Sequence, residues 1–233
     1  MSSVRLGFFQ AKTTGLGKNF SPALLLEFLM ALLIARHGQT DWNVANRWQS
    51  RSDIPLNALG YQQAKKLGDL LKARGFVPIQ MFSSPLGRAR ETAAILGQTL
   101  GLNVAVEPTL VELDLGDYEG RLESEIRAGD SDAYDDWRQG CYLKPPPGGE
   151  GIRDVACRIK DFAVNLDDTA GDILLVGHQG VNMALKAQLS NCFTRECLNS
   201  FRQDNDEIDL WDLDPACSTG RLRIASDESP SPI

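Results

Sequence analysis

The sequence predicts an α/β protein, a three-layer α/β/α sandwich with a mostly parallel central sheet, and two observations support this prediction. Short runs of apolar residues, typical of strands buried on both faces, alternate with longer segments that place apolar residues at helical spacing. Polar and charged residues follow directly after several of the apolar runs. The chain has 233 residues, 42% of them hydrophobic and 24% charged, which is enough for one domain with a substantial core.

The predicted strands are short and mostly apolar. Those of the parallel sheet are residues 31–35, 78–84, 103–107 and 172–178. Two late runs, EIDLWDL and RLRIA, predict edge strands because charged residues interrupt them.

Amphipathic helices are predicted between these strands. In residues 57–75, Asn57 can cap the helix and Gly75 can end it. The other predicted helices are residues 86–101, two short stretches within 122–137, residues 152–166 and residues 180–189.

The N-terminal residues 1–29 differ in character from the rest of the chain. Residues 1–22 contain three basic and no acidic residues, a composition shared with organelle-targeting leaders. The alternative is an unstructured extension upstream of a natural start at Met30, which we favour because the first strand begins directly after Met30. We expect the catalytic domain to cover residues 30–225 and a disordered tail to follow at 226–233.

Charge and hydropathy limit the partners that we expect. The net charge of −7 argues against a broad nucleic-acid surface, because binding a phosphate backbone requires clustered lysine and arginine. The apolar stretch ALLLEFLMALLIA (23–35) is interrupted by Glu27 and is shorter than the roughly 20 residues that span a bilayer. We therefore expect no nucleic-acid or membrane partner and a cytoplasmic location, with organelle targeting and a homodimer left open.

The cysteines predict reduced thiols. Their number is odd and no CxxC pair is repeated, which favours a cytoplasmic protein over a disulfide framework. Cys192 and Cys197 are close enough to suggest a metal, but no histidine or second cysteine pair lies near them, so we expect small buried hydrophobic residues instead. The five cysteines are Cys141, Cys157, Cys192, Cys197 and Cys217.

Four segments bring polar residues to one predicted edge of the sheet. Ligands of open α/β sheets bind outside the carboxyl ends of the strands. The four segments are ARHG (35–38), SSPLGRARET (83–92), VELDLGDYEG (111–120) and GHQG (177–180). Each has an ordinary structural explanation when taken alone, such as a surface ion pair or a solvated acidic turn. The two histidines of the chain, however, occupy equivalent places, each after a buried strand and beside a glycine that lets the backbone approach a ligand.

These residue types suit phosphoryl transfer. Guanidinium groups match phosphate oxygens two at a time, so Arg36 and Arg88 can hold a phosphate and stabilise its transition state. A neutral His37 between them can attack phosphorus, and the arginines should lower its pKa. A carboxylic acid must then protonate the leaving oxygen and later take a proton from water.

The segments RHGQTDWN, SSPLGRARETA, VELDLGDYEG and GHQG resemble, in order and spacing, those of the histidine phosphatase superfamily, also called the phosphoglycerate mutase-like family. The resemblance covers about residues 30–215 and implies a phosphoglycerate mutase-like fold. It implies His37 as the nucleophile and neither a metal nor a cofactor. The implied catalytic residues are Arg36, His37, Arg88, Glu112 and His178, and the implied substrate contacts are Arg36, Asn43, Gln49, Arg88, His178 and Gln179.

The proton donor lies in an acidic segment, where Asp114, Asp117 and Glu119 are neighbours of Glu112. Glu112 directly follows an apolar run, so we expect it to be partly buried with the raised pKa that a general acid needs at neutral pH. The donor is therefore predicted to be Glu112.

The resemblance leaves a choice between phosphatase and mutase. Mutases of this family carry a long insertion between the acid and the second histidine, whereas here only residues 113–177 separate Glu112 from His178. We therefore predict a metal-independent phosphatase for a small phosphorylated metabolite, of the broad-specificity or α-ribazole-phosphate type. A cofactor-dependent phosphoglycerate mutase and a non-catalytic member that binds phosphorylated ligands or proteins are the alternatives.

Several large side chains near the predicted mouth have two interpretations. They stack on a substrate ring or sugar, or they pack the helices that cover the site, which is commoner. These aromatic residues are Trp42, Trp48, Tyr118, Tyr134 and Trp137. Arg138 and Lys144 are candidates for contact with a second anionic group.

Overall fold

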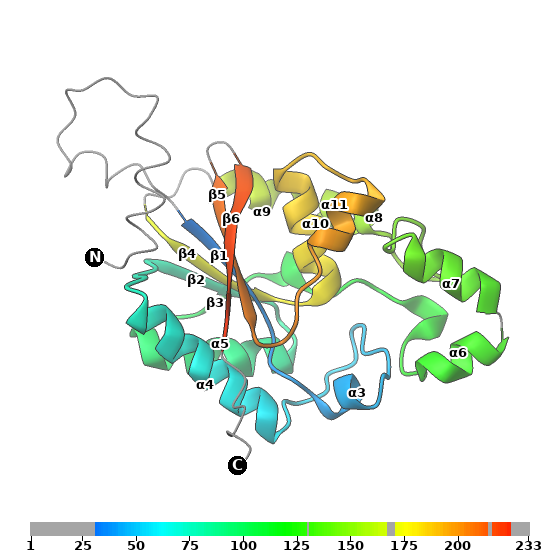
Figure 1. Ribbon diagram of the computed structural model, residues 1–233, viewed down its shortest axis with the longest axis horizontal. Helices are drawn as coiled ribbons and strands as arrows, with labels where there is room; N and C mark the ends of the chain where they lie inside the picture. Colours follow the sequence, from blue (N-terminus) through cyan, green and yellow to red (C-terminus); the bar gives the residue numbers. More distant parts are fainter. Residues whose placement is uncertain (1–30, 130, 167–170, 214–215, 225–233) are drawn as a thin grey trace, which may run out of the picture.

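The computed structural model describes residues 31–129, 131–166, 171–213 and 216–224 (Figure 1). The predicted N-terminal extension, residues 1–29, and the predicted tail, residues 226–233, lie outside the described residues. No helix in the described ranges is long and apolar enough to cross a membrane.

The described strands form one sheet in the order β3-β2-β4-β1-β5-β6. Their bounds are β1 Ala31–Arg36, β2 Gln80–Ser83, β3 Ala105–Val106, β4 Ile173–Gly177, β5 Glu207–Leu213 and β6 Ala216–Arg223. Strands β3, β2, β4 and β1 are parallel, and β5 and β6 continue the sheet antiparallel. The predicted mostly parallel sheet is confirmed.

Strand β5 corrects one expectation. We predicted an edge strand, but β5 lies between β1 and β6 and all of its residues are buried. Its acidic residues are paired: Asp209 contacts Lys186 at 2.5 Å, and Glu207 contacts Arg223 at 2.8 Å. Because buried charges are tolerated when paired, an alternating charged sequence can occupy the interior of a sheet.

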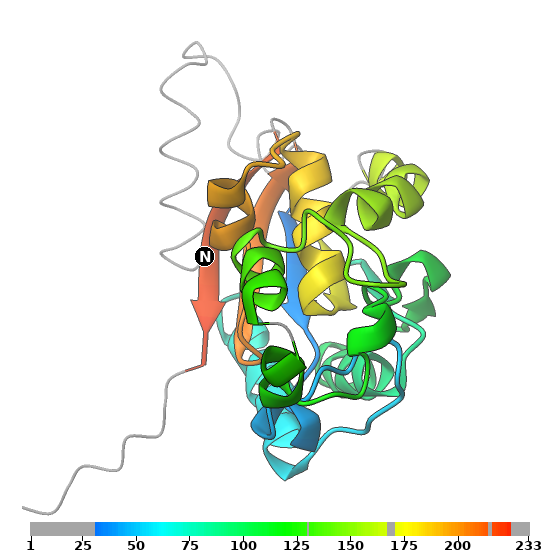
Figure 2. The same cartoon turned by 90° about the vertical axis from the view of Figure 1, so that its right-hand side faces the viewer.

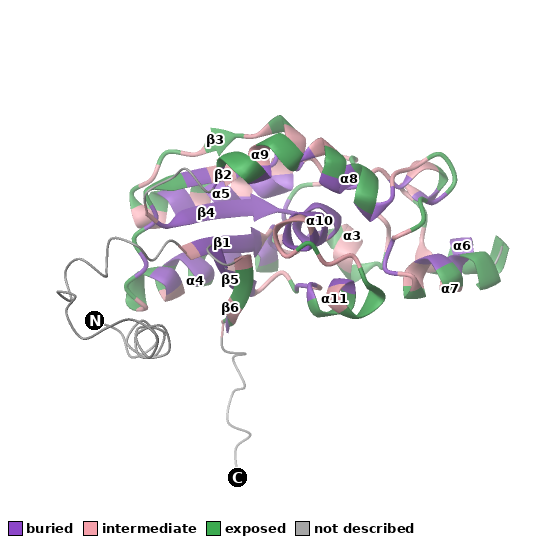
Figure 3. Ribbon diagram, turned by 90° about the horizontal axis from the view of Figure 1, so that it is seen from above, coloured by how far each residue is buried: buried purple, intermediate pink, exposed green. Residues whose placement is uncertain are grey.

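Helices cover both faces of the sheet (Figure 1). Helices α4 (Ala58–Ala73) and α5 (Gly87–Leu100) pack on one face, while α8 (Ile152–Arg158), α9 (Lys160–Asn165), α10 (Gln179–Leu189) and α11 (Arg195–Ser200) lie on the other. Alternate residues of β1 enter the two cores, Leu33 with α4 and α5, and Leu32 with α8 and α10. Figure 3 shows the neighbouring strands β1 and β4 largely buried between the two layers of helices.

The single helix predicted over 152–166 is two helices, α8 and α9. They meet at Ile159, whose backbone (φ −90, ψ 1) departs from α-helical geometry. Ile159 is itself buried, so the apolar periodicity continues across the junction and the sequence gives no sign of it.

A cap lies beyond the carboxyl ends of the strands and faces the viewer in Figure 2. It contains α6 (Glu123–Gly129) and α7 (Ser131–Gln139), the two short helices that the sequence predicts. Nearby are α3 (Asp41–Val44) and two 3-10 turns, Pro108–Leu110 and Gly116–Tyr118. Most of the large aromatic residues pack against one another here, as the commoner interpretation predicts. They are Trp48, Tyr118, Tyr134 and Trp137, together with Tyr142.

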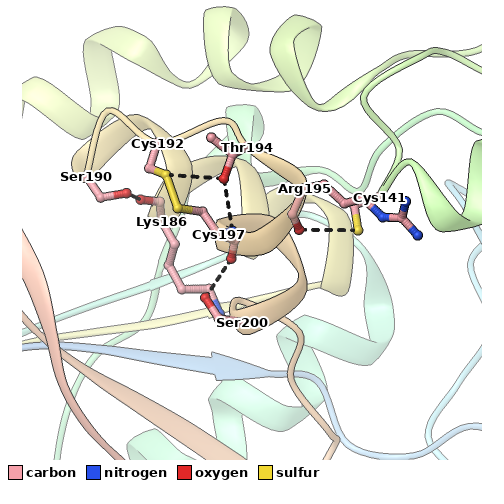
Figure 4. Close-up of a disulfide and its surroundings, with 8 residues drawn as sticks. All are labelled: Cys141, Lys186, Ser190, Cys192, Thr194, Arg195, Cys197 and Ser200. Atoms are coloured by element: carbon pink, nitrogen blue, oxygen red, sulfur yellow. Dashed lines mark hydrogen bonds between the residues drawn. A yellow bond between two sulfur atoms is a disulfide. The ribbon is translucent and has the colours of Figure 1, made fainter.

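The expectation of reduced thiols is wrong for one pair of cysteines. Cys192 and Cys197 form a disulfide between the end of α10 and the start of α11 (Figure 4). Thr194 caps α11, with its hydroxyl accepting from the Cys197 amide, and this turn brings the two Cα atoms within 6.2 Å, inside the range that a disulfide spans. The odd number of cysteines gave no indication that two of them lie close enough to form a disulfide. Cys141, Cys157 and Cys217 are free thiols.

Candidate active site

Three of the polar segments begin at the same edge of the sheet. Arg36 at the end of β1 lies opposite Gly177 at the end of β4, and the His37 amide donates to the Gly177 carbonyl at 3.0 Å. The Ser84 amide, after β2, donates to Val176 at 3.0 Å. The backbone of parallel strands therefore fixes where His37, Ser84 and the loop after β4 start.

The His37 ring is held in one tautomer. Its side chain is buried, and Nδ1 lies 2.7 Å from the Gly38 carbonyl oxygen. Because a carbonyl only accepts, the proton is on Nδ1 and the lone pair is on Nε2. Burial, and then the charges of Arg88 and Arg36, hold the pKa of His37 well below its usual 6.5. At neutral pH this imidazole is uncharged and nucleophilic at Nε2.

His178 lies beside His37, with ring centroids 5.1 Å apart. Its Nε2 is 2.7 Å from the Ser84 hydroxyl, and its buried Nδ1 makes no hydrogen bond to the described residues. Burial and the positive charge of Arg88 lower its pKa well below 6.5. His178 is fully buried and does not line the cavity in front of His37.

Two guanidinium groups converge on His37. Arg88 donates to the carbonyls of Ser50 at 2.8 Å and Ser52 at 2.7 Å. Arg36 donates to the Gln203 carbonyl at 2.9 Å. The Nε of both arginines is buried without a partner, and neither forms an ion pair with the described residues, so both have donors and charge available to an anion. Burial lowers the pKa of Arg88 to about 10, which leaves it charged at neutral pH.

Glu112 is partly buried, as predicted, and its carboxylate lies at the start of α10. Oε1 accepts from the amides of Leu113 at 2.7 Å and Val181 at 3.0 Å, and Oε2 accepts from Gly180 at 3.1 Å. Only Oε2 therefore retains a lone pair for a proton or substrate. Glycine at position 180 lets α10 approach this segment closely, because a Cβ there would lie 2.7 Å from Oε1 and 2.8 Å from the Leu113 Cβ.

The neighbouring acidic residues are placed elsewhere. Asp114 pairs with Arg51 at 3.1 Å, Glu119 accepts from Ser52 at 2.6 Å, and Asp117 is exposed. Of the four acidic residues in VELDLGDYEG, Glu112 is the one that lines the cavity.

The three remaining predicted contacts also line the cavity. Asn43 uses Oδ1 to accept from the Thr40 amide at 3.0 Å in the capping box of α3, which leaves its amide nitrogen for a ligand. Gln49 has a buried Oε1 without a partner. Gln179 accepts from the Gln203 amide at 3.2 Å and from Arg36 at 3.4 Å, so it also orients Arg36.

Other residues support the site without having been predicted. Asn205 donates to the His37 carbonyl at 2.6 Å, and Gln203 holds Arg36 through its backbone. Both lie in a segment with no motif. Ser84, which contacts His178, lies within a quoted segment, and its place directly after a strand was the available signal.

The glycine beside His37 serves packing. A Cβ on Gly38 would lie 2.4 Å from the Gly60 carbonyl in the first turn of α4. The interpretation that this glycine opens the approach for a ligand is therefore wrong; it allows close contact between the loop and α4.

The cavity has a volume of about 600 Å³ and contains Arg36, His37, Arg88 and Glu112 at one end. A tetrahedral oxyanion fits the chemistry of this end: two guanidinium groups, an imidazole lone pair and a carboxyl group. Among the residues that the structure describes, no group of three or more histidine, cysteine or acidic side chains could hold a metal ion.

Known proteins are similar to this chain in sequence. A glucosyl-3-phosphoglycerate phosphatase of Mycobacterium tuberculosis is 37% identical over 168 residues, covering 68% of this chain and 74% of that protein. A 2,3-bisphosphoglycerate-dependent phosphoglycerate mutase of Methylobacterium sp. is 36% identical over 137 residues, 57% of this chain and 65% of the mutase.

Solved structures of other proteins have the same fold as this chain. The mycobacterial glucosyl-3-phosphoglycerate phosphatase in complex with VO3 has a TM-score of 0.72 at 33% identity, covering 78% of this chain and 92% of that one. The alpha-ribazole phosphatase of Shigella flexneri has a TM-score of 0.70 at 30% identity, covering 84% and 96%. Because the family model matches residues 32–219, which contain all four segments at the sheet edge, the chain belongs to the histidine phosphatase superfamily (branch 1).

Proposed function

We propose that this protein is a phosphomonoesterase that hydrolyses a small phosphorylated metabolite through a phosphohistidine at His37. The observation that supports this most is the fixed tautomer of His37, whose uncharged Nε2 lies between two arginines. Relatives in the same superfamily are phosphatases.

In the first half-reaction, Nε2 of His37 attacks phosphorus as the bond to the leaving oxygen breaks. Glu112 Oε2 gives its proton to that oxygen. Arg36 and Arg88 stabilise the charge on the phosphoryl oxygens. In the second half-reaction, Glu112 takes a proton from water, the resulting hydroxide oxygen bonds to phosphorus, and the P–N bond breaks to release phosphate.

We assign His178 the role of a neutral donor. The Ser84 hydroxyl accepts from the Leu86 amide at 3.3 Å and can donate its own proton to Nε2 of His178. The proton of the neutral ring is then on Nδ1, which is buried without a partner among the described residues, and we propose that it donates to a phosphoryl oxygen once phosphorus is bonded to the adjacent His37.

The experiment is to quench the enzyme during turnover of a ³²P-labelled phosphomonoester and look for acid-labile, alkali-stable label. We expect label at His37, none in His37→Ala, and release of inorganic phosphate from a panel of sugar phosphates, nucleotides and phosphoglycerates. No label and no hydrolysis across the panel would favour the non-catalytic alternative. Transfer of the label to a second phosphoglycerate faster than to water would favour the mutase.

We make three further proposals. The first is a catalytic domain at residues 30–225, and the second, which the family resemblance implies, is a metal-independent reaction. The third, from composition and charge, is a cytoplasmic protein without nucleic-acid or membrane partners, with a homodimer left open. Activity that persists in a chelator tests the second. The Cys192–Cys197 disulfide opposes a cytoplasmic location, because cytosolic thiols are kept reduced. Trapping and counting the free thiols of the protein in intact cells tests this. Five free thiols would support a cytoplasmic location, and three would support an oxidising compartment.

A further inference from the structure

Glu112 differs from the other groups of the site in how its backbone is held. Arg36 ends a strand, Arg88 lies in the first turn of α5, and His178 directly precedes α10. Residues 111–115, which carry Glu112, are neither helix nor strand. The backbone groups of such a segment need partners from elsewhere in the molecule. The position of the proton donor therefore depends on what holds this segment.

Two charged residues hold this segment, one on each side of the proton donor. Arg158, the last residue of α8, donates to the carbonyls of Thr109 and Val111, the second of these at 3.0 Å. Glu150 accepts from the Asp114 amide at 3.0 Å through Oε2, and its own amide donates to the Asp114 carbonyl at 2.8 Å. The backbone is thus fixed both before and after the proton donor.

The Glu150 carboxylate is the centre of a cluster of charges. Besides the Asp114 amide, Oε2 contacts Arg51 at 3.1 Å and Arg158 at 3.2 Å. Arg51 also contacts the Asp114 carboxylate at 3.1 Å. We call Arg51, Asp114, Glu150 and Arg158 the Glu150 cluster. Its side chains are between 20% and 39% exposed, so solvent screens their charges less than it screens a fully exposed pair.

Arg51 connects the Glu150 cluster to the phosphate-binding residues. It lies between Ser50 and Ser52, whose carbonyls hold Arg88. The Ser50 hydroxyl joins the same two segments, because it accepts from the Leu115 amide at 2.9 Å. One loop therefore holds the phosphate-binding arginine and is linked to the segment that carries the proton donor.

The Glu150 cluster lies outside the cavity. None of its four residues is among the described residues that line the space in front of His37. Any effect of the cluster on the reaction is therefore exerted through residues that do line it. Glu112 must meet the leaving oxygen while Arg88 holds the phosphoryl group, and a displacement of about 1 Å between such groups costs about 10²-fold in rate.

We propose that the residues of the Glu150 cluster are positioning residues, which hold the proton donor Glu112 in register with the phosphate-binding Arg88. The proposal rests on the proposed function, because it takes Glu112 to protonate the leaving oxygen. Loss of the cluster should slow a reaction that needs this proton and spare one that does not. A general loss of stability would slow both reactions equally.

The test compares phenyl phosphate with p-nitrophenyl phosphate, which differ only in the nitro group. Phenolate is the stronger base, so its departure depends more on a proton from Glu112. In Glu150→Ala, rapid-quench measurement should show phosphoryl transfer to His37 slowed by about 10- to 100-fold with phenyl phosphate and by less than about 3-fold with p-nitrophenyl phosphate. Glu150→Gln, which retains an oxygen that accepts from Asp114, should restore most of the rate. Equal losses on the two esters would overturn the proposal.

A double variant shows through which residue Glu150 acts. In the Glu112→Gln background, Glu150→Ala should cost nothing further on phenyl phosphate, because the proton donor is already absent. Losses that multiply would show that Glu150 acts independently of Glu112 and would overturn the proposal.

Asp136→Ala is the matched control, because Asp136 forms an exposed ion pair with Lys144; both rates should stay unchanged. If Glu150→Ala does not fold, Arg51→Met changes the most exposed member of the cluster. It should slow transfer from phenyl phosphate by about 3- to 10-fold, less than the loss of Glu150, because Arg158 and Glu150 still hold the segment. Unchanged rates in folded Arg51→Met would overturn the proposal.

Failure of this proposal and failure of the proposed function are distinguishable. If the wild-type protein hydrolyses neither ester, the function is wrong, and amide resonances in NMR spectra still test the cluster. The amides of Gly180 and Val181 donate to the Glu112 carboxylate, so their resonances should shift in Glu150→Ala and not in Asp136→Ala. Resonances that do not shift in folded Glu150→Ala would overturn the proposal.

Discussion

The two ends of the cavity are built differently. The phosphate end (Arg36, His37 and Arg88) is mounted on strand and helix ends and is held largely by backbone carbonyls. The cap end (Arg138, Tyr142 and Arg202) is mounted on a short helix and two loops and is held mainly by side chains. The difference teaches that the sheet fixes the positions of Arg36, His37 and Arg88, while the cap can vary without disturbing the sheet.

Burial follows the same division. At the phosphate end, His37 is 3% exposed and Arg88 1%. At the cap end, both arginines are half-buried. Substitutions at the phosphate end should therefore affect every substrate, and those at the cap end should discriminate between substrates.

The largest effect is expected from Glu112→Gln, which retains the shape of the side chain and removes the proton. On an alkyl phosphate, kcat/KM should fall by about 10²- to 10⁴-fold. On p-nitrophenyl phosphate, whose leaving group needs no proton, the first-turnover burst should be nearly retained. Rapid-quench measurement of the burst checks this, and equal losses on both esters would remove Glu112 from the role of general acid.

The next largest effect is expected from Gly180→Ala. The new Cβ, 2.7 Å from Oε1 of Glu112, displaces the carboxylate, and a misplaced group of this kind costs about 10²-fold in kcat. Gly129→Ala in α6 is the matched control, since nothing lies within 4 Å of its Cβ, and its kcat should stay unchanged. Similar activity of the two variants would show that Glu112 does not need its contacts with α10.

Removal of the disulfide should destabilise the cap-end side of the molecule. For Cys192→Ser/Cys197→Ser, the free energy of unfolding should fall by about 2 kcal/mol, the value expected for so short a loop. Urea denaturation measures it, with Cys157→Ser, an exposed free thiol, as the control. A wild-type midpoint that reductant does not change would show that the disulfide contributes nothing to stability.

The smallest effect is the pH dependence of stability at the phosphate end. The folded-state pKa values of His37 and His178 lie well below 6.5, so the unfolded chain binds more protons as pH falls. Their stabilisation is present above about pH 6.5 and is lost as pH falls towards the folded-state values, by up to about 1.4 kcal/mol per pH unit for each histidine. In His37→Gln the slope between pH 6.5 and 5.5 should be about half that of the wild type; an unchanged slope would contradict the assignment.

Much of the phosphate end could be predicted from the sequence. His37 and Arg36 follow a continuous apolar run, and parallel strands bring their carboxyl ends to one edge, so local pattern and a general rule of the fold were sufficient. The same reasoning found Glu112 because an apolar run precedes it. It did not find Gln203 or Asn205, because they lie in a segment without a motif and reach the site only through the antiparallel return of β5.

The sequence by itself determined the alternation of strands and helices, the residue chemistry suited to phosphoryl transfer, and the segments that deliver it. Only the tertiary structure decided that β5 is interior, that Cys192 meets Cys197, and that Tyr142 holds two unpaired arginines. The physical reason is the distance along the chain over which each effect acts. Periodicity and residue type act over a few neighbouring positions, whereas the place of β5 and the arrangement around Tyr142 depend on packing between elements that are separate in the chain. The disulfide depends on the geometry of the turn between α10 and α11, which residue type alone does not fix.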